Sequence, residues 1–338
     1  MDVTPEQLRD TGFAVQFDAV AETVSVADRD RGPNLAVVSD PYAGRDLLVD
    51  HAVTRLDDPT RVALEGVASG EELPELASRD AGDAVVVENC HYLFSREVGG
   101  FGCLEGFLEA IALSAPTVVT SWNAAAWSYL DAVRDVSQSF DSVVHLPPID
   151  AVDLARLVEA HHDGPLPEFV QTSADGRVKT VSFDRATVSP LGGREVTVPM
   201  PNLNTEYLLS RDATETVGDV EAVVFQKLVQ VAGGNPGVAT ACWDESVRDG
   251  QVAPGFVAEY DPQFSLDDDA AFVLELVVSN DRIRRQTLDQ IRPTVQVDKA
   301  LQTLAESGLV AVDGEWARVA PTHWRAAKEH LEGRQLLW

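Results

Sequence analysis

Five short apolar runs in the first half of the chain constrain its fold most. Each is rich in valine, and stretches with helical patterning separate one run from the next. Continuous apolar runs that alternate with helices are typical of parallel strands buried on both faces. The sequence therefore predicts an α/β domain over residues 1–163, with helices on both faces of a parallel sheet. The runs are residues 35–38, 62–64, 84–87, 117–120 and 143–146.

The pattern changes after residue 163. The turn pairs Asp175-Gly176 and Gly192-Gly193 divide short alternating stretches, which predicts a small β-rich insertion or linker over residues 164–212. A helical segment follows at 217–232, breaks at a Gly-Gly-Asn-Pro-Gly turn and continues as a second helix to about residue 247. We assign residues 213–250 to this pair of helices.

The last part of the chain, residues 262–338, carries a different signature. Its patterning predicts helices at 268–278, 282–291 and 295–307, and a further helix at 321–333. Between the last two lies Asp313-Gly314, flanked by alternating stretches, which is a strong signal for a tight β-hairpin. Three short helices followed by a hairpin predict a winged helix.

The charge of the chain limits what can be inferred about its ligands. The net charge is -29, and only four of the 26 basic residues are lysine. An acidic, lysine-poor composition resembles that of proteins from salt-loving archaea, so the charge reports the solvent and not the ligand. No apolar run is long enough to cross a bilayer and no secretion signal precedes the first helix, so we expect a cytoplasmic protein. The lysines are Lys179, Lys227, Lys299 and Lys328.

The loop after the first apolar run reads Ser-Asp-Pro-Tyr-Ala-Gly-Arg-Asp, and a helical stretch follows it. Its context and spacing match the phosphate-binding P-loop, Gly-x-x-x-x-Gly-Lys-Ser/Thr. Ser39 replaces the first glycine, whose freedom lets backbone amides wrap phosphate, whereas Gly44 stands at the second. Arg45 keeps the positive charge of the lysine, but Asp46 replaces the hydroxyl that binds magnesium and would repel a phosphate. The loop predicts weakened nucleotide binding, and an ordinary strand-to-helix turn is the alternative.

The third apolar run ends in Glu88 and Asn89. This segment resembles the Walker B strand of ATPases of the AAA type and their STAND relatives. That resemblance puts Glu88 at the magnesium-orienting aspartate and Asn89 at the glutamate that activates water. Because an amide cannot accept a proton, we do not expect general-base catalysis there. A capped strand end, with Glu88 facing solvent, is the alternative.

Two further features extend the resemblance. Asn123 ends the next predicted strand, where these families carry a sensor of the γ-phosphate. The turn that contains Pro236 resembles the proline-bearing helix break in the lid of STAND ATPases, which a winged helix also follows. The order of the four motifs implies an AAA- or STAND-type P-loop ATPase with a degenerate Walker A loop. ATP or ADP, with magnesium, is the ligand implied.

Three functions fit these residues. The first is a catalytically impaired pseudo-ATPase that serves as a scaffold or regulator of a protein partner, such as an active paralogue or a membrane complex. The second is a live ATP-dependent switch, in which Arg45 binds phosphate, Asp46 and Glu88 hold magnesium, and Asn123 senses the γ-phosphate. The third is a winged-helix DNA-binding regulator. DNA or a protein partner would contact Arg282, Arg284, Arg285, Arg292 and Lys299, although Asp281 and Asp289 offset this charge.

Overall fold

The structure is a computed structural model of the chain. It describes residues 3–25, 31–68, 84–113, 116–162, 164–171, 181–188, 196–203, 217–258, 264–291 and 295–337. No helix within these ranges is both long and apolar enough to span a membrane.

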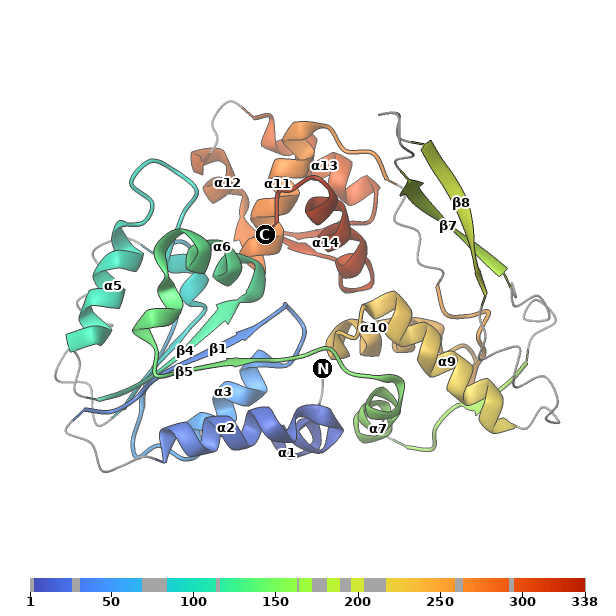
Figure 1. The fold of residues 1–338 in the computed structure, drawn as a ribbon, viewed down its shortest axis with the longest axis horizontal. Helices are drawn as coiled ribbons and strands as arrows, with labels where there is room; N and C mark the ends of the chain where they lie inside the picture. Colours follow the sequence, from blue (N-terminus) through green and yellow to red (C-terminus); the bar gives the residue numbers. More distant parts are fainter. Residues whose placement is uncertain are drawn as a thin grey trace.

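A five-stranded parallel sheet forms the centre of the N-terminal half, as the apolar runs predict (Figure 1). The strand order is β2-β3-β4-β1-β5, so that β4 lies between β1 and β3 and the first strand is internal. The carboxyl ends of β1, β3 and β4 therefore meet at one edge of the sheet. The strands are β1 (Asn34–Ser39), β2 (Thr60–Ala63), β3 (Ala84–Glu88), β4 (Thr117–Asn123) and β5 (Ser142–His145).

Both faces of the sheet are covered by helices, which confirms the predicted α/β class. Alternate residues of β1 enter different hydrophobic clusters: Leu35 and Val37 on one face, Ala36 and Val38 on the other. Burying each such valine or leucine stabilises the fold by about 1.5–3 kcal/mol. The first face is covered by α2 (Ala14–Val24), α3 (Arg45–Val53) and α7 (Ala151–His161), and the second by α5 (Gly102–Leu113) and α6 (Ala124–Arg134).

A pair of helices, α9 (Val217–Ala232) and α10 (Pro236–Ser246), packs beside α7. They are joined by Gly233 and Gly234, which both have positive φ, and Asn235 caps α10 by accepting a hydrogen bond from the Val238 amide. Phe225 of α9 stacks on Trp243 of α10 with ring centroids 5.5 Å apart. The helix bounds are those that the sequence predicts.

The segment predicted to be β-rich contains an antiparallel pair, β7 (Val181–Val188) and β8 (Val196–Leu203). A second, two-residue pairing joins β6 (Glu168–Phe169) to β9 (Gln251–Val252). The turn pairs Asp175-Gly176 and Gly192-Gly193 lie outside the described residues.

The C-terminal unit, residues 264–337, contains helices and a three-stranded antiparallel sheet of order β10-β12-β11. The predicted helix over 282–291 is wrong at its start. Asp281 has φ +56°, which ends the preceding helical path, and residues 282–284 then pair with β12 instead of coiling. The elements are α11 (Asp268–Ser279), β10 (Arg282–Arg284), α12 (Arg285–Ile291), α13 (Val297–Glu306), β11 (Val310–Asp313), β12 (Trp316–Val319) and α14 (Trp324–Gly333).

Candidate functional site

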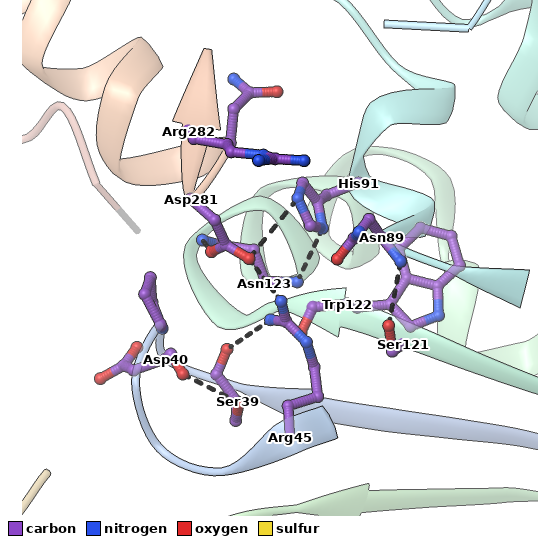
Figure 2. Close-up of polar contacts among 12 residues, drawn as sticks. Ser39, Asp40, Arg45, Asn89, His91, Ser121, Trp122, Asn123, Asp281 and Arg282 are labelled. Carbon is purple, nitrogen blue, oxygen red and sulfur yellow. Dashed lines mark hydrogen bonds and ion pairs between the residues drawn. The ribbon is translucent and has the colours of Figure 1, made fainter. Parts of the chain in front are cut away.

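The candidate site lies at the carboxyl edge of the sheet, where the predicted motif residues follow neighbouring strands. Ser39 ends β1 and stands in register with Asn123, which ends β4. Ligand sites of open parallel sheets form at this edge. In this structure the turn between α11 and β10 reaches the same place, so that Asp281 of the C-terminal unit lies among the motif residues (Figure 2).

Arg45 is the first residue of α3 and follows Gly44, which has φ +92°, a conformation that glycine adopts without cost. Its side chain is buried, and the residue is only 7% exposed. The Nη1 atom donates to the carbonyl oxygen of Trp122 at 3.0 Å and to that of Ser39 at 3.4 Å. The Nη2 atom forms an ion pair with Asp281. The charge at the position that the sequence matches to a P-loop lysine is therefore neutralised by a carboxylate of the chain itself.

Asp281 receives a second hydrogen bond, from Asn123 Nδ2 to its Oδ1 at 2.6 Å. Burial by itself raises the pKa of this carboxyl. The charge of Arg45, with smaller effects from His91 and from the hydrogen bonds, outweighs burial, so that the pKa is lowered. Asp281 is consequently ionised at neutral pH.

Both polar atoms of the Asn123 side chain form hydrogen bonds within the chain. Its Oδ1 accepts hydrogen bonds from the amides of Ala125 and Ala126 at 2.8 and 3.1 Å, which caps α6. Its Nδ2 donates to Asp281 and, at 2.8 Å, to the carbonyl oxygen of Val278. The predicted sensor residue therefore joins the sheet to the C-terminal unit.

His91 is the third group beside the Asp281 carboxylate, and it is only 1% exposed. The backbone N–H of Asn123 donates to Nδ1 of His91 at 3.3 Å, which leaves the proton of the neutral ring on Nε2. The Nε2 atom is 3.7 Å from Asp281 Oδ2. Burial lowers the pKa of His91 to about 4, and the nearby Asp281 only partly opposes this effect. The ring is neutral at pH 7.

Tyr92 braces the turn that carries Asp281. Its hydroxyl lies 2.9 Å from the carbonyl oxygen of Asn280 and 2.6 Å from that of Arg282, and it can donate to either. Asn280 Nδ2 in turn donates to the carbonyl oxygen of Leu276 at 2.8 Å. The backbone on each side of Asp281 is thereby fixed either to its own helix or to the sheet and the helices that cover it, which we call the core domain.

The two residues predicted from the Walker B resemblance face the edge strand. Both oxygens of Glu88 accept hydrogen bonds from Arg61 of β2, at 2.5 and 3.1 Å. Asn89 adopts a left-handed conformation with φ +59°, and its Nδ2 donates to the carbonyl oxygen of Leu64 at 3.2 Å. The backbone N–H of Asn89 donates to Ser121 Oγ at 2.9 Å. These contacts hold the end of β3 against its neighbours.

The loop between Ser39 and Arg45 is covered by other parts of the chain. Asn235 Nδ2 donates to the carbonyl oxygen of Pro41 at 2.7 Å, and the Gly237 amide donates to that of Tyr42 at 3.0 Å. The buried Pro236, predicted to contact a cofactor, is the first residue of α10 and lies between the two residues that contact the loop. From the C-terminal unit, Val319 accepts a hydrogen bond from the Tyr42 hydroxyl at 2.6 Å, and Lys328 pairs with Asp40 at 2.7 Å.

The residues present do not fit a magnesium nucleotide. Asp281 neutralises Arg45 and Arg61 neutralises Glu88, while the Ser39 hydroxyl donates to the carbonyl oxygen of Asp40. Asp46 is exposed at the start of α3. Across the described residues, no group of three His, Cys, Asp or Glu side chains is arranged to hold a metal ion.

The predicted partner-contact residues lie on and beside the small sheet of the C-terminal unit. The guanidinium groups of Arg282 and Arg284 lie over the Trp316 ring, 4.6 and 4.7 Å from its centroid. Arg285 pairs with Asp298 at 2.7 Å. Lys299 is exposed on α13, and Arg292 lies outside the described residues.

Sequence reasoning missed Asp281, His91 and Tyr92 as site residues, and only a local signal was available for Asp281. Asn280-Asp281 follows an apolar helix, and Asn and Asp are the residues that most readily enter left-handed turns. Nothing in the sequence pairs residue 281 with residue 45.

No protein-family model and no curated protein matches the chain. Among solved structures, the chain is similar to the RuvB Holliday junction branch migration motor of Thermotoga maritima, with a TM-score of 0.40 and 12% identity over 98% of this chain and 95% of that one. A single-substitution variant of that motor gives a TM-score of 0.41 at 12% identity, with the same coverage.

Proposed function

We propose that the chain is an ATPase-like protein that does not hydrolyse nucleotide and works as a regulatory or scaffold subunit through protein–protein contacts. The observation that carries this proposal is the buried ion pair between Arg45 and Asp281. The cation that would hold phosphate in a P-loop is already used to attach the C-terminal unit to the sheet.

The energetics of that pair oppose nucleotide entry. To reach Arg45, a triphosphate would have to displace the Asp281 carboxylate. That carboxylate would then be left without its counter-charge. Breaking a buried ion pair by removing one partner costs about 3–5 kcal/mol. The Tyr42 and Lys328 contacts, which hold the C-terminal unit on the loop, would add to this cost.

The chemistry at the end of β3 also supports a protein without hydrolytic activity. Asn89 cannot accept a proton from water, and its side chain donates to the carbonyl oxygen of Leu64. Glu88 is held by two hydrogen bonds from Arg61. An ATP-dependent switch would require each of these side chains to be released.

A protein partner is favoured over DNA. Arg282 and Arg284 lie over Trp316, and Arg285 is paired with Asp298, so these cations are partly engaged within the chain. Concentrated salt would also weaken any contact between these cations and DNA phosphates. We infer a winged helix that packs on the core and serves as a protein surface, in a cytoplasmic protein adapted to concentrated salt.

The test is a titration with Mg-ATP in concentrated potassium chloride, followed by thermal unfolding and by release of inorganic phosphate. We expect no saturable rise in the unfolding midpoint at about 1 mM ATP, since that limit corresponds to binding weaker than about -4 kcal/mol. The Asn89→Glu variant, which restores a general base, is expected to release no phosphate either. Saturable stabilisation by Mg-ATP, or hydrolysis by Asn89→Glu, would favour the switch.

A further inference from the structure

We propose that Asp281 is a tethered ligand: its carboxylate occupies a small oxyanion site formed by Arg45, Asn123 and His91, and removing it unmasks a site for inorganic phosphate. This inference deepens the proposed function, because it names the group that keeps the phosphate position closed. It also assigns the C-terminal unit a role in closing that position.

The donors around Asp281 converge from separate elements of the core domain. Arg45 comes from the start of α3, Asn123 from the end of β4, and His91 from the segment after β3 (Figure 2). Arg45 and Asn123 each donate to a different oxygen of the carboxylate. A guanidinium, an amide and a ring N–H around one point form a cradle for an oxyanion, and charge-assisted hydrogen bonds of this kind are the strong ones.

The cradle also has donors that Asp281 does not satisfy. His91 Nε2 is buried and carries the ring proton, but at 3.7 Å from Asp281 Oδ2 it is beyond hydrogen-bond distance. Arg45 Nε is likewise buried, and it has no hydrogen-bond partner among the described residues, whereas the His91 ring has at most an interaction with the Asn280 backbone. Buried donors are normally satisfied, so their presence indicates a site with more donors than a carboxylate can meet. A tetrahedral oxyanion offers four oxygens.

The turn that presents Asp281 is built to hold the carboxylate in place. Residue 281 has φ +56°, a left-handed conformation that Asp adopts more readily than most residues and that turns its side chain toward the sheet edge. The Tyr92 hydroxyl contacts the carbonyl oxygens on both sides of Asp281, and Asn123 Nδ2 also holds the carbonyl oxygen of Val278. The core domain therefore binds the turn as well as the side chain, as it would bind a ligand.

The experiment compares wild type with Asp281→Ala and the isosteric Asp281→Asn. Thermal unfolding is followed while potassium phosphate replaces potassium chloride at constant ionic strength. We expect both variants to unfold at lower temperature than wild type in chloride. Phosphate is expected to raise the midpoint of Asp281→Ala saturably by about 2 °C or more, whereas the amide of Asp281→Asn still fills the site and should prevent this response. Wild type is expected to show no saturable response.

Two controls separate the site from general effects of phosphate. Asp298→Ala removes the exposed partner of Arg285, so it breaks an Arg–Asp pair elsewhere in the C-terminal unit and is expected to gain no phosphate response. Adding Asn123→Ala to Asp281→Ala removes a donor from the cradle and is expected to abolish the response. If Asp281→Ala is unfolded in chloride, recovery of its folded signal in phosphate becomes the readout.

The absence of any phosphate response in Asp281→Ala would overturn the inference and leave Asp281 as a structural ion-pair partner only. An equal response in wild type would also overturn it, because the site would then not be masked. Neither result depends on Mg-ATP. Conversely, Mg-ATP binding by wild type would refute the proposed absence of nucleotide binding even where phosphate rescues Asp281→Ala.

Discussion

At the scale of single residues, local chemistry could be predicted from the sequence, but its partners could not. Gly44 stands where a helix must begin after a left-handed residue, and Asn123 ends a strand and caps a helix, so both positions follow from their neighbours. The role of Arg45 depends on Asp281, which is 236 residues away. Such a contact depends on the packing of the whole chain, which local patterns do not encode.

His91 should make stability depend on pH. Its folded pKa of about 4 lies below the ordinary 6.5, so between these values the unfolded chain binds a proton that the folded chain does not. Stability is thus retained above pH 6.5 and lost as pH falls toward 4, at up to about 1.4 kcal/mol per pH unit. From pH 7 to 5 we expect His91 to account for a loss of about 2 kcal/mol, measurable by denaturant unfolding at constant salt.

The His91→Asn variant should be less stable at pH 7 but show a shallower dependence on pH than wild type. The matched control is His323→Asn, which makes the same substitution at an exposed position outside the site. Identical slopes for His91→Asn and wild type would mean that His91 is not the buried neutral group described above.

At the scale of elements, strong local signals were sufficient and weak ones were not. Helix α9 occupies the predicted residues 217–232 because a Gly-Gly-Asn-Pro turn ends it. Strand β10 was predicted as helix because its three residues form a strand only by pairing with β12, more than thirty positions later. The loop from Ser39 to Asp46 has P-loop spacing, but its covering by the α9–α10 turn and the C-terminal unit is a tertiary property.

Gly237 tests the contact between the α9–α10 turn and this loop. A Cβ atom at Gly237 would lie 2.2 Å from the carbonyl oxygen of Tyr42, a backbone atom that cannot easily move. We expect Gly237→Ala to lower the free energy of unfolding by about 1–3 kcal/mol, as overpacking does. At Gly102, by contrast, a Cβ would meet nothing within 4 Å. A loss for Gly102→Ala as large as that for Gly237→Ala would show that the contact is unimportant.

At the scale of the whole molecule, one hydrophobic cluster joins one face of the sheet to the helix pair and to the C-terminal unit, while a second cluster lies on the other face. The first cluster includes Leu8 near the N-terminus, Val37 of the sheet, Trp243 of the helix pair and Leu331 of α14. The parts therefore share a core in spite of their different sequence signatures. The sequence predicts the separate parts from their periodicity, but the shared core arises from which faces meet.

A shared core predicts cooperative unfolding. Chains of several domains commonly unfold in steps, because each domain has a core of its own. Here we expect the described parts to unfold in a single calorimetric transition, with equal calorimetric and van't Hoff enthalpies. Two resolved transitions, with the C-terminal unit melting apart from the sheet, would contradict this expectation and would place the cohesion of the molecule in polar contacts alone.

The separation of Arg45 from Asp281 also affects the order in which the protein can fold during translation. Arg45 leaves the ribosome 236 residues before the carboxylate that neutralises it. A guanidinium buried without a counter-charge is strongly destabilising. We therefore expect Arg45 to stay hydrated at the carboxyl edge of the sheet until the C-terminal unit, with Asp281, has been synthesised and covers it.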